Sequence, residues 1–400
     1  MTGPAASLHD AARHGITATH GPPEWSPAQG AWVVSRYADA AAVLRHPDLA
    51  VADVAAGVRH IGRRAGRSYT SLTRLLGGIL FFRNPPFQPI ARRFLRQSMA
   101  AMAPRLAPEA VAPIVARVLD EAAGDDPVDA MARIGKRLPV LVMADALGLA
   151  EGSAAVMHDR GAGLLAAAER GLPLRVLGTL DQQAATLEEM LRGAIDAGGA
   201  PDSGIAQMRA INRAEFGFDD EAFLGCVFFL LMAGIETTSA LLGSALLFTR
   251  LYPDERRRLA ETPERIAPFI DEVLRVASPV RRMNGRLAEA PLEIGGNTIA
   301  AGVPIVVDIE RAHHDPAAHA GPARFVVGRR GPPALAFGVG GRACLGASLA
   351  RLETRLLLQQ LSAYDIAHGE GRPDWEDNPR LRRLSSLHLH LRHKTSRSDR

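Results

Sequence analysis

The sequence predicts a mainly α-helical protein with a few small β-sheets. Over most of the chain apolar residues recur every three to four positions, which is the period of a helix. Only a few short segments show the two-residue period of a strand, and strands do not alternate with helices as in a parallel α/β sheet. Because no Ser/Gly-rich linker divides the 400 residues, we expect one large domain over 23–393, a flexible segment at 1–22 and a disordered basic tail at 394–400.

Each expected element follows from its local pattern. Apolar residues at helical spacing predict helices over 90–105, 107–123, 134–149, 154–168, 175–196, 263–276 and 346–361. Strand patterns occur over 32–37, 303–309 and 387–391, and Gly295-Gly296 between two short apolar stretches predicts a hairpin over 292–299.

The composition narrows the class of function. The 47 Lys and Arg residues include only two lysines, and the formal charge is +4. Such a diffuse excess is weak evidence for nucleic-acid binding, and it suits an acidic protein partner or an anionic ligand equally well. Two cysteines, Cys226 and Cys344, exclude a disulfide scaffold and fit a reducing compartment. Residues 1–20 show no export signal, so we expect a cytoplasmic protein.

One apolar segment, 222–249, is long enough to cross a bilayer. It carries a single charge, Glu236, and as a helix it would be about 42 Å long. That charge lies at the middle, where lipid would disfavour it most, and no basic cluster flanks the segment. We therefore expect a central helix buried inside the protein and no membrane association.

The stretch Phe337-Gly-Val-Gly-Gly-Arg-Ala-Cys344-Leu-Gly346 has three interpretations. It formally fits a dinucleotide fingerprint, but no βαβ unit follows it. A structural cysteine in a glycine turn is the second interpretation. The third is a metal thiolate, because glycines let N–H groups approach the sulfur and the following helix directs its positive end at an anion. With one Cys and no metal-spaced partner, zinc and iron–sulfur sites are excluded, and an axial thiolate to haem iron remains.

This motif resembles that of the cytochrome P450 haem-thiolate monooxygenases of the soluble bacterial type, and further family motifs follow in the expected order over most of the chain. The resemblance implies a triangular, α-rich single domain around a buried haem b. It also implies that Cys344 is the axial iron ligand, that Phe337 packs near the sulfur, and that Gly338 and Gly346 shape the loop.

The central apolar segment contains Ala233-Gly234-Ile235-Glu236-Thr237-Thr238, which is similar to the family pattern A/G-G-x-D/E-T-T. On the residues alone, Thr237 back-bonding to the Ala233 carbonyl and bending the helix is as good an interpretation. The resemblance implies instead that Thr237 is the hydroxyl beside dioxygen and Glu236 the acid behind it in a proton relay. Ala233 and Gly234 then lie against the cofactor, and Gly234 leaves room for dioxygen.

Glu272 and Arg275 stand three residues apart on one expected helix. On a surface such a pair contributes only a few tenths of a kcal/mol. Their similarity to the family's E-x-x-R motif implies a buried pair that organises the segment leading to the cysteine loop. Its usual third member is an arginine in a Phe-Asp-Pro-type stretch, and Arg329 takes this place although Asp and Pro are absent.

Haem carries two propionates, which need cationic or hydrogen-bonding partners when buried. Arg92, Arg286 and Arg342 match the propionate ligands of the family. Many relatives have His four residues before the first of these, whereas this chain has Gln88. The Gln88 amide can donate a hydrogen bond but carries no charge, so we expect weaker haem retention than with His.

The family resemblance places a small-molecule substrate above the haem. The resemblance implies that a loop after the first strands, 51–80, lines that pocket together with the segment formed by Val280, Arg281, Arg282 and Met283. The two arginines favour an anionic substrate, although one solvated arginine and one paired to a helix end explain them equally well.

Nothing in the chain resembles a flavin or iron–sulfur module. We therefore expect a monomer that receives NAD(P)H-derived electrons through a ferredoxin reductase and a ferredoxin, with O2 as co-substrate. An acidic ferredoxin has a candidate docking face in Arg329, Arg330, Arg342 and Arg351.

Three functions are consistent with these residues. The first is hydroxylation or other oxidation of a small, secondary-metabolite-like compound. The second is the same haem-thiolate chemistry diverted to desaturation, coupling or nitrogen chemistry. The third is a non-catalytic haem sensor or recruitment protein, against which Glu236 and Thr237 argue because a sensor needs no proton relay.

Overall fold

The computed structural model describes residues 20–168, 172–369 and 373–394. The expected flexible segment and basic tail fall almost entirely on residues 1–19 and 395–400, outside the described residues. The chain forms two compact units. The first unit comprises Met1–Leu49, Val111–Pro139 and Thr237–Arg400, and the second comprises Ala50–Ala110 and Val140–Glu236. The expectation of one domain over 23–393 stays a prediction, and each unit is described by itself.

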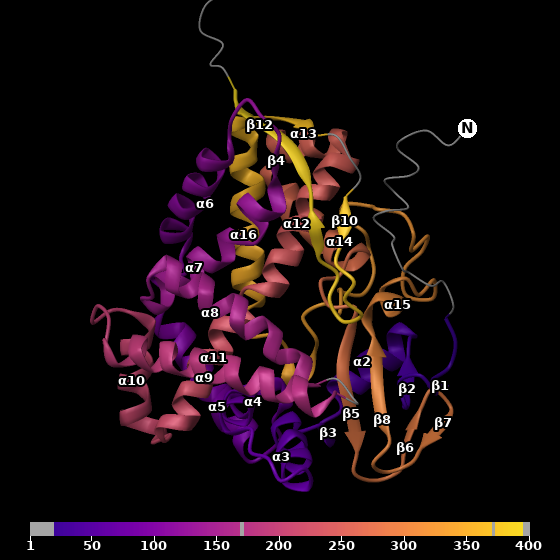
Figure 1. Ribbon diagram of the computed structural model, residues 1–400. Coiled ribbons are helices and arrows are strands. Elements are labelled where there is room, and N and C mark those ends of the chain that lie inside the picture. Colours follow the sequence, from indigo (N-terminus) through magenta and orange to yellow (C-terminus); the bar gives the residue numbers. More distant parts are fainter. Residues whose placement is uncertain (1–19, 169–171, 370–372, 395–400) are drawn as a thin grey trace, which may run out of the picture. The chain divides into compact units, whose positions relative to one another are not determined.

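A five-stranded sheet forms one part of the first unit. Its strand order is β1 (Glu24–Ser26), β2 (Ala31–Val34), β8 (Pro304–Asp308), β5 (Arg282–Ala288) and β3 (Leu49–Val51). β2 runs parallel to β8 with Trp32 opposite Ile305, whereas β5 is antiparallel to β8. Figure 1 shows β5 and β8 side by side, with helix α2 (Tyr37–Arg45) next to them.

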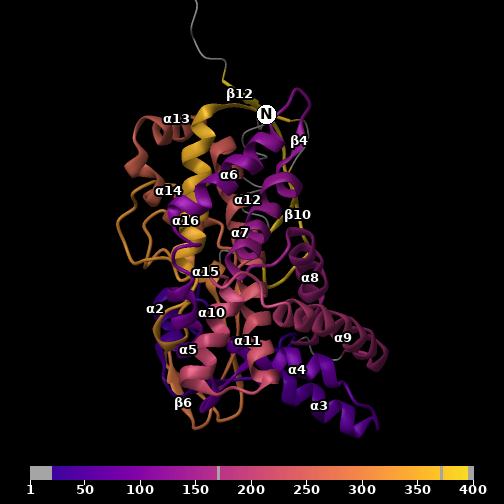
Figure 2. The same ribbon diagram turned by 90° about the vertical axis from the view of Figure 1, so that its left-hand side faces the viewer.

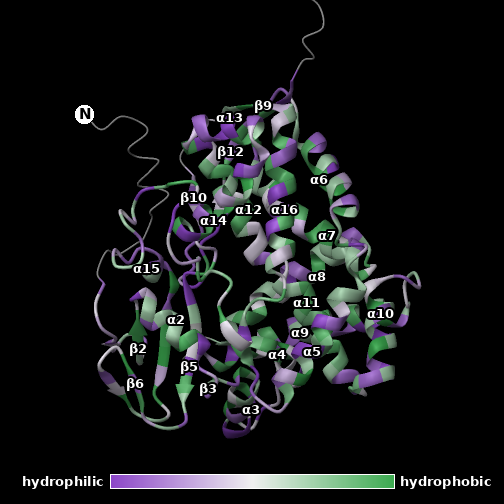
Figure 3. Ribbon diagram, turned by 180° about the vertical axis from the view of Figure 1, so that it is seen from behind, coloured by the Kyte–Doolittle hydropathy of each residue, from purple (hydrophilic) through white to green (hydrophobic). Residues whose placement is uncertain are grey.

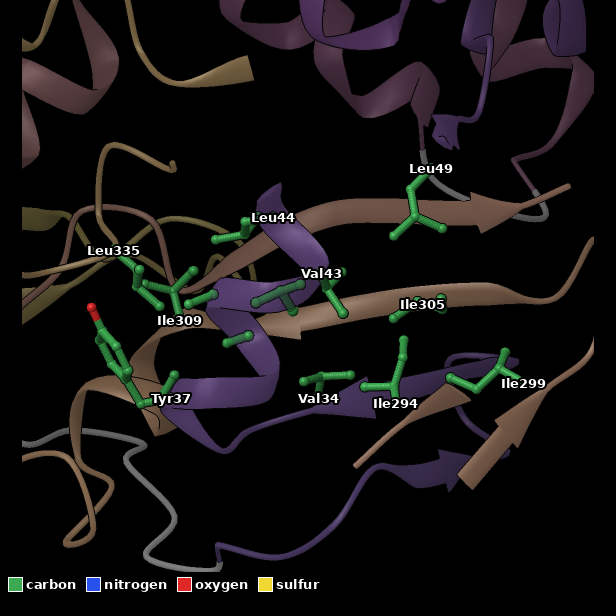
Figure 4. Packing of buried hydrophobic residues seen from close by; sticks show 14 of the residues in the cluster. Val34, Tyr37, Val43, Leu44, Leu49, Ile294, Ile299, Ile305, Ile309 and Leu335 are labelled. Atoms are coloured by element: carbon green, nitrogen blue, oxygen red, sulfur yellow. The ribbon is translucent and has the colours of Figure 1, made fainter. Parts of the chain in front are cut away.

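Helix α2 packs its apolar side against this sheet. Val43 from the helix, Val34 from β2 and Ile305 from β8 belong to one buried cluster (Figure 4). Burying each aliphatic side chain of this kind contributes about 1.5–3 kcal/mol. The short strands are thus held by packing on α2 as well as by their own hydrogen bonds.

The expected hairpin is confirmed. Strand β6 (Leu292–Ile294) pairs with β7 (Asn297–Ile299), and Gly295 and Gly296 between them have φ of 56° and 84°. Two successive positive φ values are what a two-residue hairpin turn requires, and glycine adopts them without strain.

The rest of the first unit is mostly helical. Its further helices are α12 (Glu236–Leu251), α13 (Pro253–Glu261), α14 (Ile266–Val276), α15 (Ile309–His313) and α16 (Ala347–Gln360). A three-stranded sheet has the order β4 (Val128–Asp129), β12 (His388–His393) and β9 (Tyr364–His368), and β10 (Asp374–Trp375) pairs with β11 (Leu384–Ser386). Figure 3 shows the contrast between α13, which is largely hydrophilic, and β2, which is largely hydrophobic.

The second unit is mostly helical and begins with the last two residues of β3. Its helices are α3 (Val54–Arg64), α4 (Thr70–Gly78), α5 (Phe87–Ala101), α8 (Glu151–Leu164), α9 (Leu174–Asp196), α10 (Gly204–Ile211) and α11 (Asp220–Ala233). α6 (Pro108–Ala122) and α7 (Arg137–Leu147) cross between the units. Figure 2 shows α3 beside α4. A Cβ on Gly78 would lie 2.2 Å from the Cα of Gly225, so α4 and α11 meet backbone to backbone.

The loop expected over 51–80 is wrong, because this segment contains α3 and α4. The buried side of α3 consists of Ala55, Val58 and Gly62, so small residues carry the helical period and large apolar residues do not. The strand expected over 32–37 is β2, and it ends earlier than expected, at Val34, since α2 begins at Tyr37.

The prediction of a buried central helix is confirmed, with a break. Asp220–Leu251 is long and apolar enough to span a membrane, but 72% of its most apolar window is buried inside the protein, as in an ordinary core helix. α11 ends at Ala233 and α12 begins at Glu236. Cys226 is fully buried in α11, and burial raises the pKa of its thiol to about 12, so this cysteine belongs to the core.

Helix α16 buries a carboxyl group that has no partner. Glu353 is 0% exposed, and neither carboxyl oxygen has a hydrogen-bond partner among the described residues. Burial raises the pKa of this group well above 4.5. A raised pKa means that the folded state holds the proton more tightly than the unfolded state. Stability from this site is therefore complete below about pH 4.5 and is lost as the pH rises toward the raised pKa.

We expect Glu353→Gln, which cannot ionise, to be more stable than the wild type at pH 8 by at least ~1 kcal/mol, with a much smaller difference at pH 4.5. Urea unfolding at both pH values measures this. Glu289→Gln, at an exposed position, is the control and should show no such gain. Equal effects of Glu353→Gln at the two pH values would contradict the account.

Candidate functional site

The cysteine loop is held by its own backbone. The Gly338 N–H donates to the Leu335 carbonyl at 2.8 Å, and the Cys344 N–H donates to the Phe337 carbonyl at 2.8 Å. A single 3-10 turn, Gly340–Arg342, lies between these bonds. The Cys344 side chain is exposed, so the loop presents a thiol that the protein does not cover.

Three positions of this loop require glycine, because of a positive φ or because of a close neighbouring atom. Gly338 and Gly340 have φ of 66° and 79°, a region that other residues rarely adopt. A Cβ on Gly340 would also lie 3.0 Å from the Cα of Arg45. Gly346 precedes the first residue of α16, and a Cβ there would meet the Cys344 sulfur at 4.0 Å. The N-terminal end of a 14-residue helix next to the sulfur favours a thiolate.

The aromatic ring of the motif lies under an arginine. The Arg351 guanidinium is 5.4 Å from the centre of the Phe337 ring and 2.5 Å from an Asp271 oxygen. The cation and the ring together fix the start of the cysteine loop against α16.

Arg286 and Arg342, both in the first unit, lie close enough for their charges to repel each other. Arg286, on β5, is 7% exposed, and its pKa falls to about 10 because of burial and the nearby charge of Arg342. No carboxylate of the described residues pairs with Arg286. A register shift between Met283 and Arg286 interrupts the β5–β8 ladder, which re-aims side chains locally. A buried cation of this kind calls for an external anion, and a haem propionate fits the requirement.

The structure joins Glu272, Arg275 and Arg329 in one cluster. Arg275 donates to both Glu272 oxygens at 2.8 Å, and both side chains are 3% exposed. The Arg329 Nε lies 3.1 and 3.2 Å from the same two oxygens. One carboxylate therefore bridges two guanidinium groups inside the protein.

The same cluster holds the chain that precedes the cysteine loop. Arg275 donates to the carbonyls of His313, Pro322 and Arg324 at 2.8–3.0 Å. Arg329 donates to the carbonyl of Arg324 at 2.6 Å. The segment 313–324, which has little regular structure, is thus tied to α14 by side-chain bonds.

In the second unit, Gln88 and Arg92 lie four residues apart on α5, which places them on the same side of the helix. Gln88 is buried and Arg92 is half-buried. The pair therefore presents one amide and one cation in the same direction.

The break between α11 and α12 is open to solvent. Ala233 is exposed and Gly234 and Glu236 are half-exposed, although the residues on both sides are mostly buried. Thr237, the first residue of this segment assigned to the other unit, is also half-exposed. In the second unit a Cβ on Gly234 would lie 3.0 Å from the Met143 sulfur, so only glycine leaves this contact undisturbed.

The expected substrate segment contains paired charges. Arg281 pairs with Glu310 at 3.1 Å and Arg282 with Asp308 at 3.4 Å. Val280 forms an isolated β-bridge, and Met283 lies on β5 near Gly338. Both arginines therefore have carboxylate partners, but Glu310 also pairs with Arg382, and the Arg282 side chain is 38% exposed. An anionic substrate at this segment stays a prediction.

The expected docking face for a ferredoxin also needs correction. Arg329 is no part of a docking face, because its guanidinium is bound to the buried Glu272; Arg330 beside it is exposed. His313 lies at the end of α15 and is fully buried, and the sequence predicts no role for it. Asp308, the last residue of β8, caps α15 by accepting from the Arg311 N–H, and this is the sequence signal for that short helix.

Comparisons with known proteins agree with this geometry. The family model described as "Cytochrome P450" matches residues 266–386. The chain is 26% identical over 350 residues to the biotin biosynthesis cytochrome P450 of Bacillus subtilis (strain 168), covering 85% of this chain and 86% of that protein. It is 28% identical over 309 residues to the cytochrome P450 monooxygenase PikC of Streptomyces venezuelae, covering 76% and 72%. The fold is similar to that of epothilone D-bound cytochrome P450epoK, with a TM-score of 0.81, 22% identity and coverage of 98% and 96%.

Glu272→Gln should lower the free energy of unfolding by about 3–5 kcal/mol, because it leaves two buried guanidinium groups without a carboxylate. Asp254→Asn removes a carboxylate from Arg257 at the same i,i+3 spacing, but at a site where both side chains are more than 70% exposed. That control should cost less than ~0.5 kcal/mol. Denaturant unfolding of both variants measures the difference, and similar costs would show that burial of the Glu272 cluster has no energetic consequence.

Proposed function

The chain belongs to the cytochrome P450 family of bacterial haem monooxygenases, and on that premise we propose how its own residues serve the reaction. The protein oxidises a small organic substrate with dioxygen. We assign Cys344 as the axial thiolate. The observation that supports this most directly is an exposed thiol, presented by a backbone-bonded loop at the start of α16.

Haem would be held by several groups of this chain. Arg286 and Arg342 neutralise propionates, which supplies the anion that the buried Arg286 lacks. Gln88 and Arg92 add a hydrogen-bond donor and a second cation. Phe337, Gly338 and Gly346 shape the loop around the sulfur, and Ala233 and Gly234 leave room beside the cofactor. When bound, the haem iron supplies the activation of dioxygen.

Proton delivery falls to the break in the central helix. Thr237 holds a proton on its Oγ1, the Glu236 carboxyl group in its protonated form replaces that proton after transfer, and the resulting carboxylate takes up a new proton from solvent. Both side chains are half-exposed within an otherwise buried helix, so the packing of the protein core does not enclose them. The substrate segment, residues 280–283, packs near Gly338 of the cysteine loop through Met283. By this packing the segment excludes bulk water from the substrate side of the haem.

We propose a secondary-metabolite-like substrate, since PikC and the polyketide biosynthesis cytochrome P450 PksS of Bacillus subtilis are among the similar proteins. We also propose NAD(P)H as the electron source, acting through a ferredoxin reductase and a ferredoxin that meets exposed arginines such as Arg330. A cytoplasmic, monomeric protein is consistent with the burial of its one long apolar helix.

The ligand assignment is tested by the carbon monoxide spectrum of the reduced, haem-loaded protein. We expect the red-shifted Soret band of thiolate ligation in the wild type and its loss in Cys344→Ser. Cys226→Ala, at the buried second cysteine, is the matched control and should keep the band. Survival of the band in Cys344→Ser, or its absence from the wild type, would overturn the assignment.

Thr237→Ala should reduce the fraction of electrons that reaches product by about 10-fold or more, with hydrogen peroxide formed instead. The reason is that a positioned proton donor typically contributes about 10²–10⁴-fold to the rate of the step it serves. Product and peroxide measured against NAD(P)H consumption report this ratio. Thr238→Ala changes the same side chain at the next, buried position and should leave the ratio nearly unchanged. Unaltered coupling in Thr237→Ala would remove this hydroxyl from the mechanism.

A further inference from the structure

A buried histidine bonds directly to the chain that leads into the cysteine loop. His313 is 0% exposed at the end of α15, and the Leu335 N–H donates to its Nε2 at 2.6 Å. A ring nitrogen that accepts carries no proton, so the ring is neutral with its proton on Nδ1. Leu335 is also fully buried, so without His313 its N–H would lose its partner away from water.

From Leu335 the hydrogen bonds continue to the cysteine. The Leu335 carbonyl accepts from the Gly338 N–H at 2.8 Å, and the Phe337 carbonyl accepts from the Cys344 N–H at 2.8 Å. Pro332 and Pro333 just before this segment have no N–H to anchor it. Two side-chain bonds hold the segment: the Tyr37 hydroxyl donates to the Pro333 carbonyl at 2.7 Å, and the Leu335 N–H donates to His313. The His313 bond is the one at the residue where the turn at Gly338 starts.

The other end of His313 is equally fixed. Its carbonyl accepts from Arg275 at 2.9 Å, and Arg275 is held by both oxygens of Glu272. One residue thus connects the Glu272 cluster, through its backbone, to the cysteine loop, through its ring.

We propose that His313 is a positioning residue for the axial cysteine: its ring nitrogen sets the Leu335 amide and, through the turn at Gly338, the place of Cys344. This inference rests on the proposed function of Cys344 as the iron ligand. It gives His313 a role distinct from filling space, because the role depends on one acceptor atom.

The surroundings keep that acceptor available. Arg275 on α14 and the neighbouring rings of His314 and His319 face His313, and burial together with these groups lowers its pKa well below 6.5. A protonated ring would face the Leu335 N–H with a second donor, and a buried positive charge would stand beside Arg275. The site therefore selects a neutral side chain with an acceptor.

Three variants separate the acceptor from the ring. His313→Phe keeps an aromatic ring and removes the acceptor. His313→Gln places an amide oxygen near the position of Nε2 and restores it. His319→Phe is the matched control, because His319 is 1% exposed and neither of its ring nitrogens has a hydrogen-bond partner among the described residues.

Amide hydrogen exchange of the peptide covering 335–344 is the main measurement, in the haem-free and in the haem-loaded protein. We expect about 10- to 100-fold faster exchange in His313→Phe, since a lost buried hydrogen bond removes local protection. His313→Gln should stay within ~3-fold of the wild type, and His319→Phe should leave this peptide unchanged. In the haem-loaded protein, His313→Phe should also lower the share of the carbon monoxide complex that shows the thiolate band.

Unchanged exchange and an unchanged band in His313→Phe would overturn the proposal. So would equal losses in His313→Phe, His313→Gln and His319→Phe, which would show a packing role only. If His313→Phe does not fold, His313→Asn replaces it, because its shorter side chain keeps polarity but withdraws the acceptor from Leu335. Exchange in the haem-free protein is independent of the iron ligand. An absent thiolate band in the wild type would therefore refute the proposed function and leave this measurement intact.

Discussion

The buried carboxylate of Glu272 is the constraint on which the site depends. It holds Arg275 and Arg329, and these two guanidinium groups in turn bond the carbonyls of a segment that has little secondary structure of its own. A loop without a ladder of backbone bonds needs such external partners to keep one conformation. The charge cluster therefore substitutes for secondary structure between α15 and the cysteine loop.

The buried Arg286 differs from the Glu272 cluster in its charged surroundings. Around Glu272 each guanidinium group contacts a carboxylate of the chain, whereas the buried Arg286 has another cation as its charged neighbour. The first arrangement is complete without a ligand, and the second is completed by an anion. Since any ligand that binds only the folded state adds to its stability, the proposed role of Arg286 as a propionate ligand would link cofactor binding to folding.

The break in the central helix shows how one apolar segment serves two purposes. The residues on both sides of it are buried as core. At the break itself, Gly234 lacks a side chain and Glu236 and Thr237 stay half-exposed. An unbroken apolar helix would pack equally well, but it would carry no polar groups to the opening.

The sequence by itself determined the cysteine motif, the buried central segment, the Glu272–Arg275 spacing and the Gly295-Gly296 hairpin, because each depends on residues close together in the chain. The sequence prediction misses helix α3 although its signals are local: Asp53 caps it by accepting from the Ala56 N–H, and Arg63 and Arg64 lie in its last turn. Tertiary structure alone decided which side of it is buried. It also decided that Arg281 and Arg282 have carboxylate partners, that Glu353 is isolated, and that His313 bonds Leu335. Charge balance and hydrogen-bond partners are set by residues tens of positions apart, and their distances exist only once the chain has folded.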